Sequence, residues 1–382
     1  DYTFKPTIFD NRIYMFQNEY RKKNKNSQFI ADFGYTKGYK SKDSDNRNGM
    51  SHLFSKMNIN LDYDNFINSK LDIFLEKVSM DTYLKIFQDV LITDKTLQED
   101  LKDTNTLTSG FKLALDHEDY NFTTGMTAYE SLQTSKNSDR FQYVFPYYNF
   151  SKDLISNFDG TLSFSSNGNN RLSNTNNLKT IVSNNINYNS NNIYSDRGFV
   201  NNFGVYFKNL NSVGKNDPNY RSSIQSEILN IYEINTQLPL LKEMGESINY
   251  ITPKISFRLN PSDMKDHSNS GNLITADNAF SINRLGLTDS FESGKSLTLG
   301  FDYRKEKKDD SEKYLEIKLA NILRDTPEYK IPRSSSAQGK MSNIFGSIEN
   351  QFSKNLTFDY DFQIDNDLST FEYNSFATEL SV

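Results

Sequence analysis

Few residues in this 382-residue chain have side chains that could carry out chemistry at a fixed site. It contains three histidines, His52, His117 and His267, and no cysteine. Thiolate nucleophiles, disulfides and cysteine-ligated metals are therefore excluded for this stretch of sequence. His117 lies among acidic neighbours in residues 116–119, a group that could bind a divalent cation. A polar tight turn explains the same residues, and we favour that interpretation.

Two further polar segments could hold a cation or be ordinary solvated loops. His267 has two nearby aspartates in a long polar stretch, where a solvated loop is the better interpretation. Asp43 and Asp45 belong to a segment that resembles a calcium loop only loosely, because Arg47 stands at a ligand position. The sequence has no phosphate-cradling glycine loop, nucleophile elbow or paired-histidine zinc motif. We therefore expect no metal, no cofactor and no enzyme.

The elements that would position such residues are strands, as residues 355–365 show. Apolar and polar residues alternate there, which predicts a strand with one apolar and one polar face. The same alternation covers residues 251–260 and 297–304. The apolar positions in the first of these three segments are Leu356, Phe358, Tyr360, Phe362 and Ile364.

The composition agrees with an alternating pattern. Hydrophobic residues make up only 36% of the chain and the mean hydropathy is -0.70, yet aromatic residues reach 14%. A disordered chain would be poor in aromatic residues, so we attribute the polarity to strand alternation and polar loops. The net charge of -6 and the lack of a long basic block predict no nucleic-acid partner. No apolar run approaches the roughly 18 residues that a membrane-spanning helix needs.

We predict roughly eighteen strands, many close to the ~9–11 residues of a tilted membrane strand. Short turns tend to alternate with long polar loops, as in outer-membrane barrels, which have short periplasmic turns and long external loops. The predicted fold is all-β, a large antiparallel transmembrane β-barrel. A large soluble β-sandwich or β-solenoid is the alternative, and the absence of a fixed repeat weakens the solenoid.

The hydrophobic effect then fixes which face of each strand points outward. A sheet can cross hydrocarbon only if its backbone groups are paired and its outward side chains are apolar. The acidic face of residues 355–365 must therefore point into a wet lumen, which a barrel of about eighteen strands is wide enough to contain. Residues 84–101 interrupt the pattern and are predicted to be partly helical.

Three prolines fall inside predicted strands: Pro6, Pro146 and Pro253. Proline lacks the backbone N–H, so each is expected at an edge, a bulge or a weak seam. A strand end or bulge is the ordinary explanation for Pro146 and Pro253. Pro6 differs because it lies in the first strand of the chain.

Taken together, the sequence resembles the barrel portion of the LptD family, the lipopolysaccharide-assembly outer-membrane proteins also called organic solvent tolerance proteins. The resemblance covers nearly all of the chain. It is carried by the stretches DYTFKPTIFDNRIYMFQNEYR (residues 1–21), NSKLDIFLEKVSMDTYLKIF (68–87), DRFQYVFPYY (139–148), YITPKISFRLNPSDMKD (250–266) and NAFSINRLGLTDSFESGKSLTLGFDYR (278–304).

The resemblance implies a function and a set of partners. Such proteins deliver lipopolysaccharide into the outer leaflet of the outer membrane of Gram-negative bacteria, with an LptE-like lipoprotein plugging the lumen. A periplasmic jelly-roll domain receives the lipid from a periplasmic Lpt bridge. We expect residues 1–382 to be a partial C-terminal β-barrel domain, without that N-terminal domain and without the closing strands.

The resemblance also suggests a role for one residue. In the family the first and last strands pair weakly and open sideways, and prolines in the opening strands weaken them. Pro6 matches such a position, so we expect it to belong to a lateral gate. Two other functions stay open from the sequence: a porin or TonB-dependent-type outer-membrane barrel for solute uptake, and a soluble secreted carbohydrate-binding β-protein.

Overall fold

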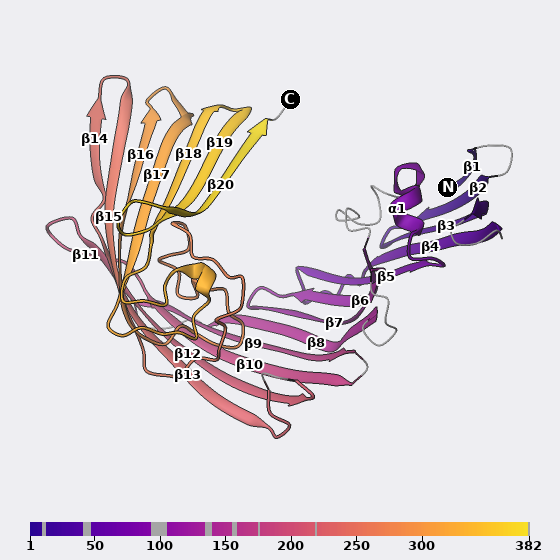
Figure 1. Ribbon diagram of the computed structural model, residues 1–382, viewed down its shortest axis with the longest axis horizontal. Coiled ribbons are helices and arrows are strands. Elements are labelled where there is room, and N and C mark those ends of the chain that lie inside the picture. Colours follow the sequence, from indigo (N-terminus) through magenta and orange to yellow (C-terminus); the bar gives the residue numbers. More distant parts are fainter. Residues whose placement is uncertain are drawn as a thin grey trace. The chain divides into compact units, whose positions relative to one another are not determined.

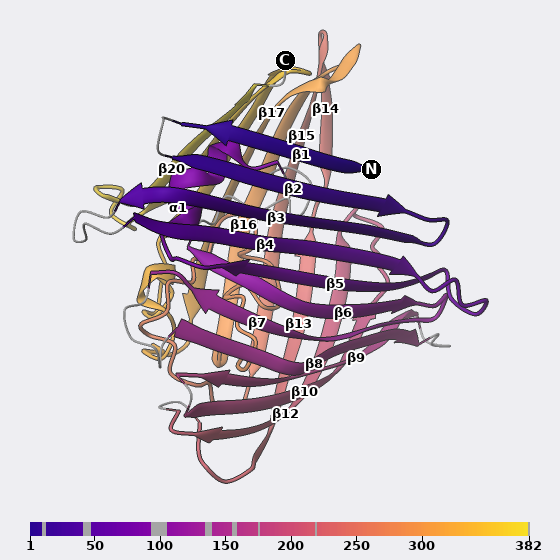
Figure 2. The same ribbon diagram turned by 90° about the vertical axis from the view of Figure 1, so that its right-hand side faces the viewer.

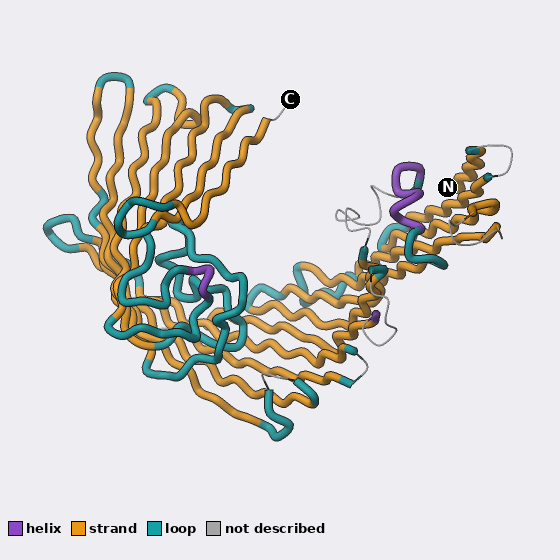
Figure 3. Tube along the Cα trace, in the orientation of Figure 1, coloured by secondary structure: helices purple, strands orange, loops and turns teal. Residues whose placement is uncertain are grey.

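The structure is a computed structural model that describes residues 1–9, 13–40, 47–92, 105–133, 140–154, 159–174, 176–217 and 220–380. Antiparallel strands make up nearly all of its regular structure (Figure 3). The chain divides into two compact units. The first contains Asp1–Asp153, Phe164–Asn184 and Asn211–Ser226, and the second Leu154–Ser163, Asn185–Leu210 and Glu227–Val382. No helix in the described ranges is long and apolar enough to cross a membrane.

The first unit is built on an antiparallel meander, in which each strand pairs with the next one along the chain (Figures 1 and 2). One short helical segment, α1 (Tyr83–Phe87) followed by the 3-10 helix η1 (Gln88–Val90), comes between the fifth and sixth strands. The strands are β1 (Tyr2–Ile8), β2 (Tyr14–Lys23), β3 (Ser27–Lys40), β4 (Arg47–Asn60), β5 (Asn68–Val78), β6 (Thr106–Asp116), β7 (Tyr120–Ser131) and β8 (Phe141–Leu154).

The second unit continues the same design. Its strands β15 to β20 pair consecutively and antiparallel. A 3-10 helix, η2 (Arg333–Ser335), interrupts the connection between β17 and β18. The strands are β11 (Ile193–Tyr194), β13 (Gln225–Gln237), β14 (Leu240–Met244), β15 (Ser247–Asn260), β16 (Gly294–Lys307), β17 (Asp310–Arg324), β18 (Ile344–Ser353), β19 (Leu356–Ile364) and β20 (Phe371–Leu380). The two units also divide three further strands, β9 (Gly160–Ser173), β10 (Asn177–Ser190) and β12 (Val200–Lys215). The last residue of β8, Leu154, belongs to the second unit, and the first two of β13, Gln225 and Ser226, belong to the first.

In the first unit the two faces of the sheet differ sharply. One face, here called the apolar face, carries large exposed side chains, including Tyr2, Phe4 and Ile8 of β1, which are 65%, 52% and 78% exposed. The opposite face is covered by the segment around α1 and buries a hydrophobic cluster. That cluster comprises Met15, Ile30, Met50, Phe54, Val78, Tyr83, Leu84, Phe87, Leu91, Leu107 and Leu132.

The second unit shows the same division into an apolar and a covered face. Ile255, Phe257, Leu299 and Phe301 are exposed on its apolar face. Two long connections, residues 261–293 between β15 and β16 and residues 325–343 between β17 and β18, pack on the other face (Figure 3). They form a second cluster with β17 and β18, comprising Met264, Ile274, Ala276, Ala279, Leu285, Leu287, Ala320, Ile322, Ile331, Ala337 and Phe345.

The prediction of all-β structure with alternating faces is confirmed. Twenty strands are present among the described residues, against the roughly eighteen predicted, because the short β11 and β14 carry too few residues to show a period. Of the stretch predicted at residues 84–101 to be partly helical, the described part contains one short helical segment over residues 83–90. Residues 93–104 lie outside the described residues, as does the Asp10-Asn11 turn between the first two strands.

The strand prolines lie where a missing donor is tolerated. Pro146 lies in β8, opposite a register shift between Gly125 and Thr127 of β7, so the predicted bulge is confirmed. Pro253 of β15 lies opposite the interruption at residues 238–239, between β13 and β14. In both places the ladder is already broken, so proline removes little hydrogen bonding.

Candidate functional site

The edge of β1 is the first candidate, because its hydrogen bonding determines on which side of the strand Pro6 removes a donor. The amide of Arg21 donates to the carbonyl of Asp1, and the amide of Phe9 donates to that of Ile13. The register between β1 and β2 is continuous, so odd-numbered β1 residues form the hydrogen-bonded pairs. Pro6, opposite Phe16, is therefore in a non-hydrogen-bonded pair. The position where an N–H would be points away from β2.

The consequence for the sheet is specific to one side of β1. Proline at position 6 costs no hydrogen bond between β1 and β2, because no β1 donor at an even-numbered position faces β2. It instead removes one donor from the opposite edge of β1. Any strand that pairs there gains fewer backbone hydrogen bonds than it would beside another residue type.

A buried ionic cluster in the second unit is the second candidate. Glu292, at the end of residues 261–293, accepts a hydrogen bond of 2.6 Å from Nε of Arg284 and also contacts Nη2 of that residue and Nη1 of Arg324. Arg258 of β15 lies 3.6 Å from Glu292 and 3.8 Å from Glu233 of β13. All five side chains are buried. The cluster therefore ties residues 261–293 to the covered face of β13, β15 and β17.

Its electrostatics favour the ionised carboxylate. Burial by itself would raise the pKa of Glu292, but the charge of Arg284 and its hydrogen bonds, followed by the charges of Arg324 and Arg258, outweigh it and lower the pKa to about 2. Arg284 also donates to the Thr298 and Ser296 hydroxyls of β16. These contacts hold the loop on the covered face of the strands.

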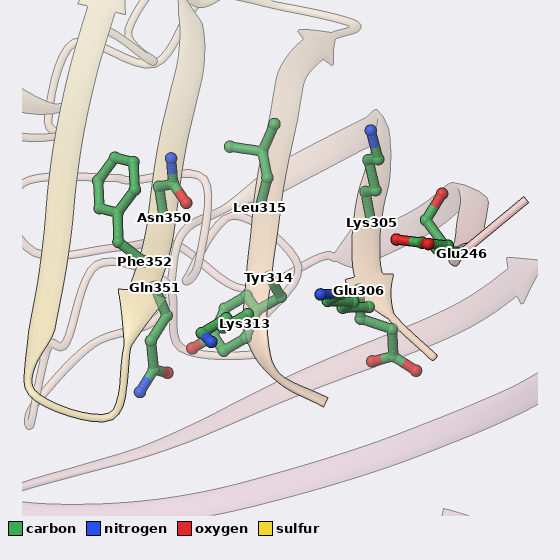
Figure 4. Close-up of a pocket in the computed structure, with 11 residues that line it drawn as sticks. Glu246, Lys305, Glu306, Lys313, Tyr314, Leu315, Asn350, Gln351 and Phe352 are labelled. Atoms are coloured by element: carbon green, nitrogen blue, oxygen red, sulfur yellow. The ribbon is translucent and has the colours of Figure 1, made fainter. Parts of the chain in front are cut away.

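An open pocket of about 510 Å³ lies at the short-turn end of β15 to β18. Figure 4 shows Lys305, Leu315 and Phe352 extending to one side of the strands. The lining carries both signs of charge, since Glu246 and Glu306 accompany the lysines. Glu306 is already a hydrogen-bond acceptor for Tyr250, at 2.8 Å. This mixed lining does not single out an anionic or a cationic ligand.

The structure separates the residues that the sequence offered as metal ligands. His117 is stacked on Tyr120, with ring centroids 4.7 Å apart, and its Nδ1 accepts a hydrogen bond from the Asp119 amide, as expected of a tight turn. His267 contacts Asp289, at 3.2 Å, rather than the aspartates near it in sequence, and it is mostly buried where we expected a solvated loop. No group of three or more potential ligands comes together in the described part of the chain. Asp43 and Asp45 lie outside the described residues.

The buried position of His52 was not predicted from the sequence. It is buried on the covered face of β4, with Nδ1 2.7 Å from the Tyr83 hydroxyl and Nε2 3.2 Å from Asp32. The cluster around Glu292 was missed as well. Only Arg258 carried a signal, as a charge on the polar face of β15, because Glu292 and Arg284 belong to a loop without periodicity.

Neither the curated proteins nor the solved structures identify this chain. None of the curated proteins matches this chain. Among solved structures it is similar to a chain in "Structure of the RagAB peptide transporter", with 8% identity over 97% of this chain. The TM-score of 0.18 is too low to support an argument, and the chain spans about half, 51%, of that chain.

The family comparison covers most of the sequence. The family model for LptD, described as "LPS transport system D", matches residues 48–381, whereas Pro6 and the first three strands precede the match. The LptD family consists of outer-membrane β-barrels, in agreement with the antiparallel strands and exposed apolar faces of both units. On the strength of this match over most of its length, the chain belongs to the LptD family.

Proposed function

We propose that this chain is part of an outer-membrane barrel that inserts lipopolysaccharide into the outer leaflet of a Gram-negative bacterium. The match to the LPS transport family over residues 48–381 carries the proposal. The apolar faces supply a surface suited to acyl chains. The opposite face, with Asp359 and Asp361 of β19, supplies a wet lining for the sugar head group.

The lipid leaves through a lateral gate at the outer edge of β1, and Pro6 belongs to this gate. Support comes from the pairing geometry, because the donor that proline lacks would point away from β2. A strand on that side would be held by fewer hydrogen bonds, so the seam opens there at lower cost. The sugar moves through the lumen while the acyl chains pass between strands.

The proposal includes partners beyond this chain. An LptE-like lipoprotein occupies the lumen, and an N-terminal periplasmic domain receives lipid from the Lpt bridge. The proposal assigns transport rather than catalysis, so the driving energy comes from elsewhere. Co-purification of a small lipoprotein with the full-length protein, at a fixed stoichiometry, is the expected result of affinity isolation from native membranes.

Controlled depletion of the full-length protein tests the proposed function. We expect newly made lipopolysaccharide to disappear from the cell surface and the outer membrane to become permeable to large hydrophobic antibiotics. Unchanged surface lipopolysaccharide after depletion would refute the function. Solute conductance of the purified barrel without a lipoprotein would favour a porin, and a monodisperse protein without detergent would favour a soluble carbohydrate-binding protein.

Pro6→Ala in the full-length protein tests the gate. Restoring the donor should strengthen the seam, so we expect slower lipopolysaccharide export and higher antibiotic sensitivity. Pro253→Ala is the matched control, because that proline also lies inside a strand but faces the interruption between β13 and β14. Equal export by both variants and the wild type would contradict the role of Pro6.

A further inference from the structure

One row of residues crosses the first five strands on the covered face. Lys5 of β1 is opposite Gln17 of β2, which is opposite Gly34 of β3. Gly34 is opposite His52 of β4, and His52 is opposite Val78 at the end of β5. The chain leaves the sheet directly after Val78. Residues 79–92, here called the strap, then run back across the strands over this row (Figure 2).

The strap is fixed over β4 by Tyr83. Its hydroxyl lies 2.7 Å from Nδ1 of His52, and the other ring nitrogen of His52 lies 3.2 Å from Asp32 of β3. All three side chains are buried. Burial, followed by the charge of Asp32, raises the pKa of Tyr83, so its hydroxyl keeps its proton.

Gly34 makes room for this contact. A Cβ at position 34 would lie 2.3 Å from Cε1 of His52 and 3.2 Å from the Tyr83 hydroxyl. The distance to His52 is far below van der Waals contact, so any side chain at position 34 would push His52 out of the row. The absence of a side chain on β3 therefore lets a residue of β4 reach the strap.

The far end of the strap contacts β1 and β2 directly. The carbonyl of Val90 accepts hydrogen bonds from Nζ of Lys5, at 2.8 Å, and from Nε2 of Gln17, at 3.0 Å. The amide of Ile92 donates to Oε1 of Gln17, at 3.2 Å. Between the two ends, Leu84, Phe87 and Leu91 are buried in the hydrophobic cluster of this face. The strap thus has polar anchors at both ends and an apolar middle.

We propose that the strap is a brace that holds β1 on β2 to β5, with Lys5 as a positioning residue for the first strand. This inference rests on the proposed function and names the side of β1 that stays closed. The brace strengthens the β1–β2 side, whereas Pro6 weakens the opposite side. The two features together confine opening to the outer edge of β1.

Hydrogen exchange of the full-length protein with its partner, in lipid nanodiscs, tests the brace. Lys5→Met keeps the aliphatic stem but removes the donor, and we expect exchange of the β1 amides to rise roughly two- to ten-fold. Gly34→Ala should speed exchange in residues 83–92 and in β1 together. Lys23→Met is the matched control, because Lys23 is an exposed lysine at the end of β2, and it should change neither.

The outcomes separate the brace from the gate. If Gly34→Ala loosens residues 83–92 while β1 exchange stays at the wild-type rate, the strap does not hold β1. Unchanged β1 exchange in Lys5→Met overturns the role of Lys5. Neither result depends on export, whereas Pro6→Ala is read by export and antibiotic sensitivity, so a failed gate and a failed brace give different results.

Discussion

Glu292→Gln should release residues 261–293 from the covered face of the second unit. The substitution keeps the shape of the side chain but removes the negative charge that Arg284, Arg324 and Arg258 share. Glu233, which lies 3.8 Å from Arg258, would then be the one carboxylate left in the cluster. Breaking a buried pair in this way costs about 3–5 kcal/mol.

The pKa of Glu292 gives a second measure of the same cost. Its value of about 2 in the folded protein, against 4.5 ordinarily, corresponds to about 3 kcal/mol of stability at neutral pH. Because the folded-state pKa is lowered, this stability is present above pH 4.5 and is lost as the pH falls toward 2. The two costs coincide at about 3 kcal/mol, which predicts that the loop opening equilibrium is raised at least roughly 100-fold in the variant.

Thiol labelling at Ala279→Cys measures this opening, because Ala279 is fully buried in the loop and this chain has no cysteine of its own. In a full-length background without other cysteines, Glu292→Gln should raise the labelling rate by about two orders of magnitude. Glu246→Gln, at an exposed turn carboxylate, is the control. Hydrogen exchange referenced to the intrinsic rate at each pH reports the acid dependence. A labelling rate within twofold of wild type would refute the reasoning.

Two further predictions concern the apolar face. Phe301→Arg places a charge in the middle of β16 on that face, at an expected cost of about 2–4 kcal/mol. The midpoint of urea unfolding in lipid should fall accordingly, whereas the control Phe301→Leu should unfold at nearly the wild-type midpoint. Gly346→Val should lower the temperature at which folded electrophoretic mobility is lost, because a Cβ there would lie 2.0 Å from Cζ of Phe362 on the paired strand. An overpacking cost of about 1–3 kcal/mol is expected, and unchanged mobility would show that the ring moves aside freely.

Strands β15, β16, β17 and β19 could be predicted from the sequence because one face of each is largely apolar. In β19 the rings of Phe358 and Phe362 contact Phe376 and Phe371 of β20 on the apolar face. Gln363, of the opposite parity, donates instead to the carbonyl of Ile274 in the covering loop. Lipid imposes the same requirement on every outward position, so a period of two is enough to identify it.

The covered face could not be predicted in the same way. Met15, Met50 and Phe54 lie on the side that alternation assigns to water, and they are buried because the strap packs over them. Such packing depends on which loop folds back over which strands, and that is a property of tertiary structure. The contact between Tyr83 and His52 likewise joins residues that share no sequence motif, so no local pattern predicts it.

The hydrophobic cluster of the first unit has a consequence for assembly. Most membrane sheets have no interior until their ends meet, because lipid solvates one side and water the other. Here residues 15–132 already enclose apolar side chains between the sheet and the strap. We therefore expect these early strands to form a cooperative folding nucleus on their own.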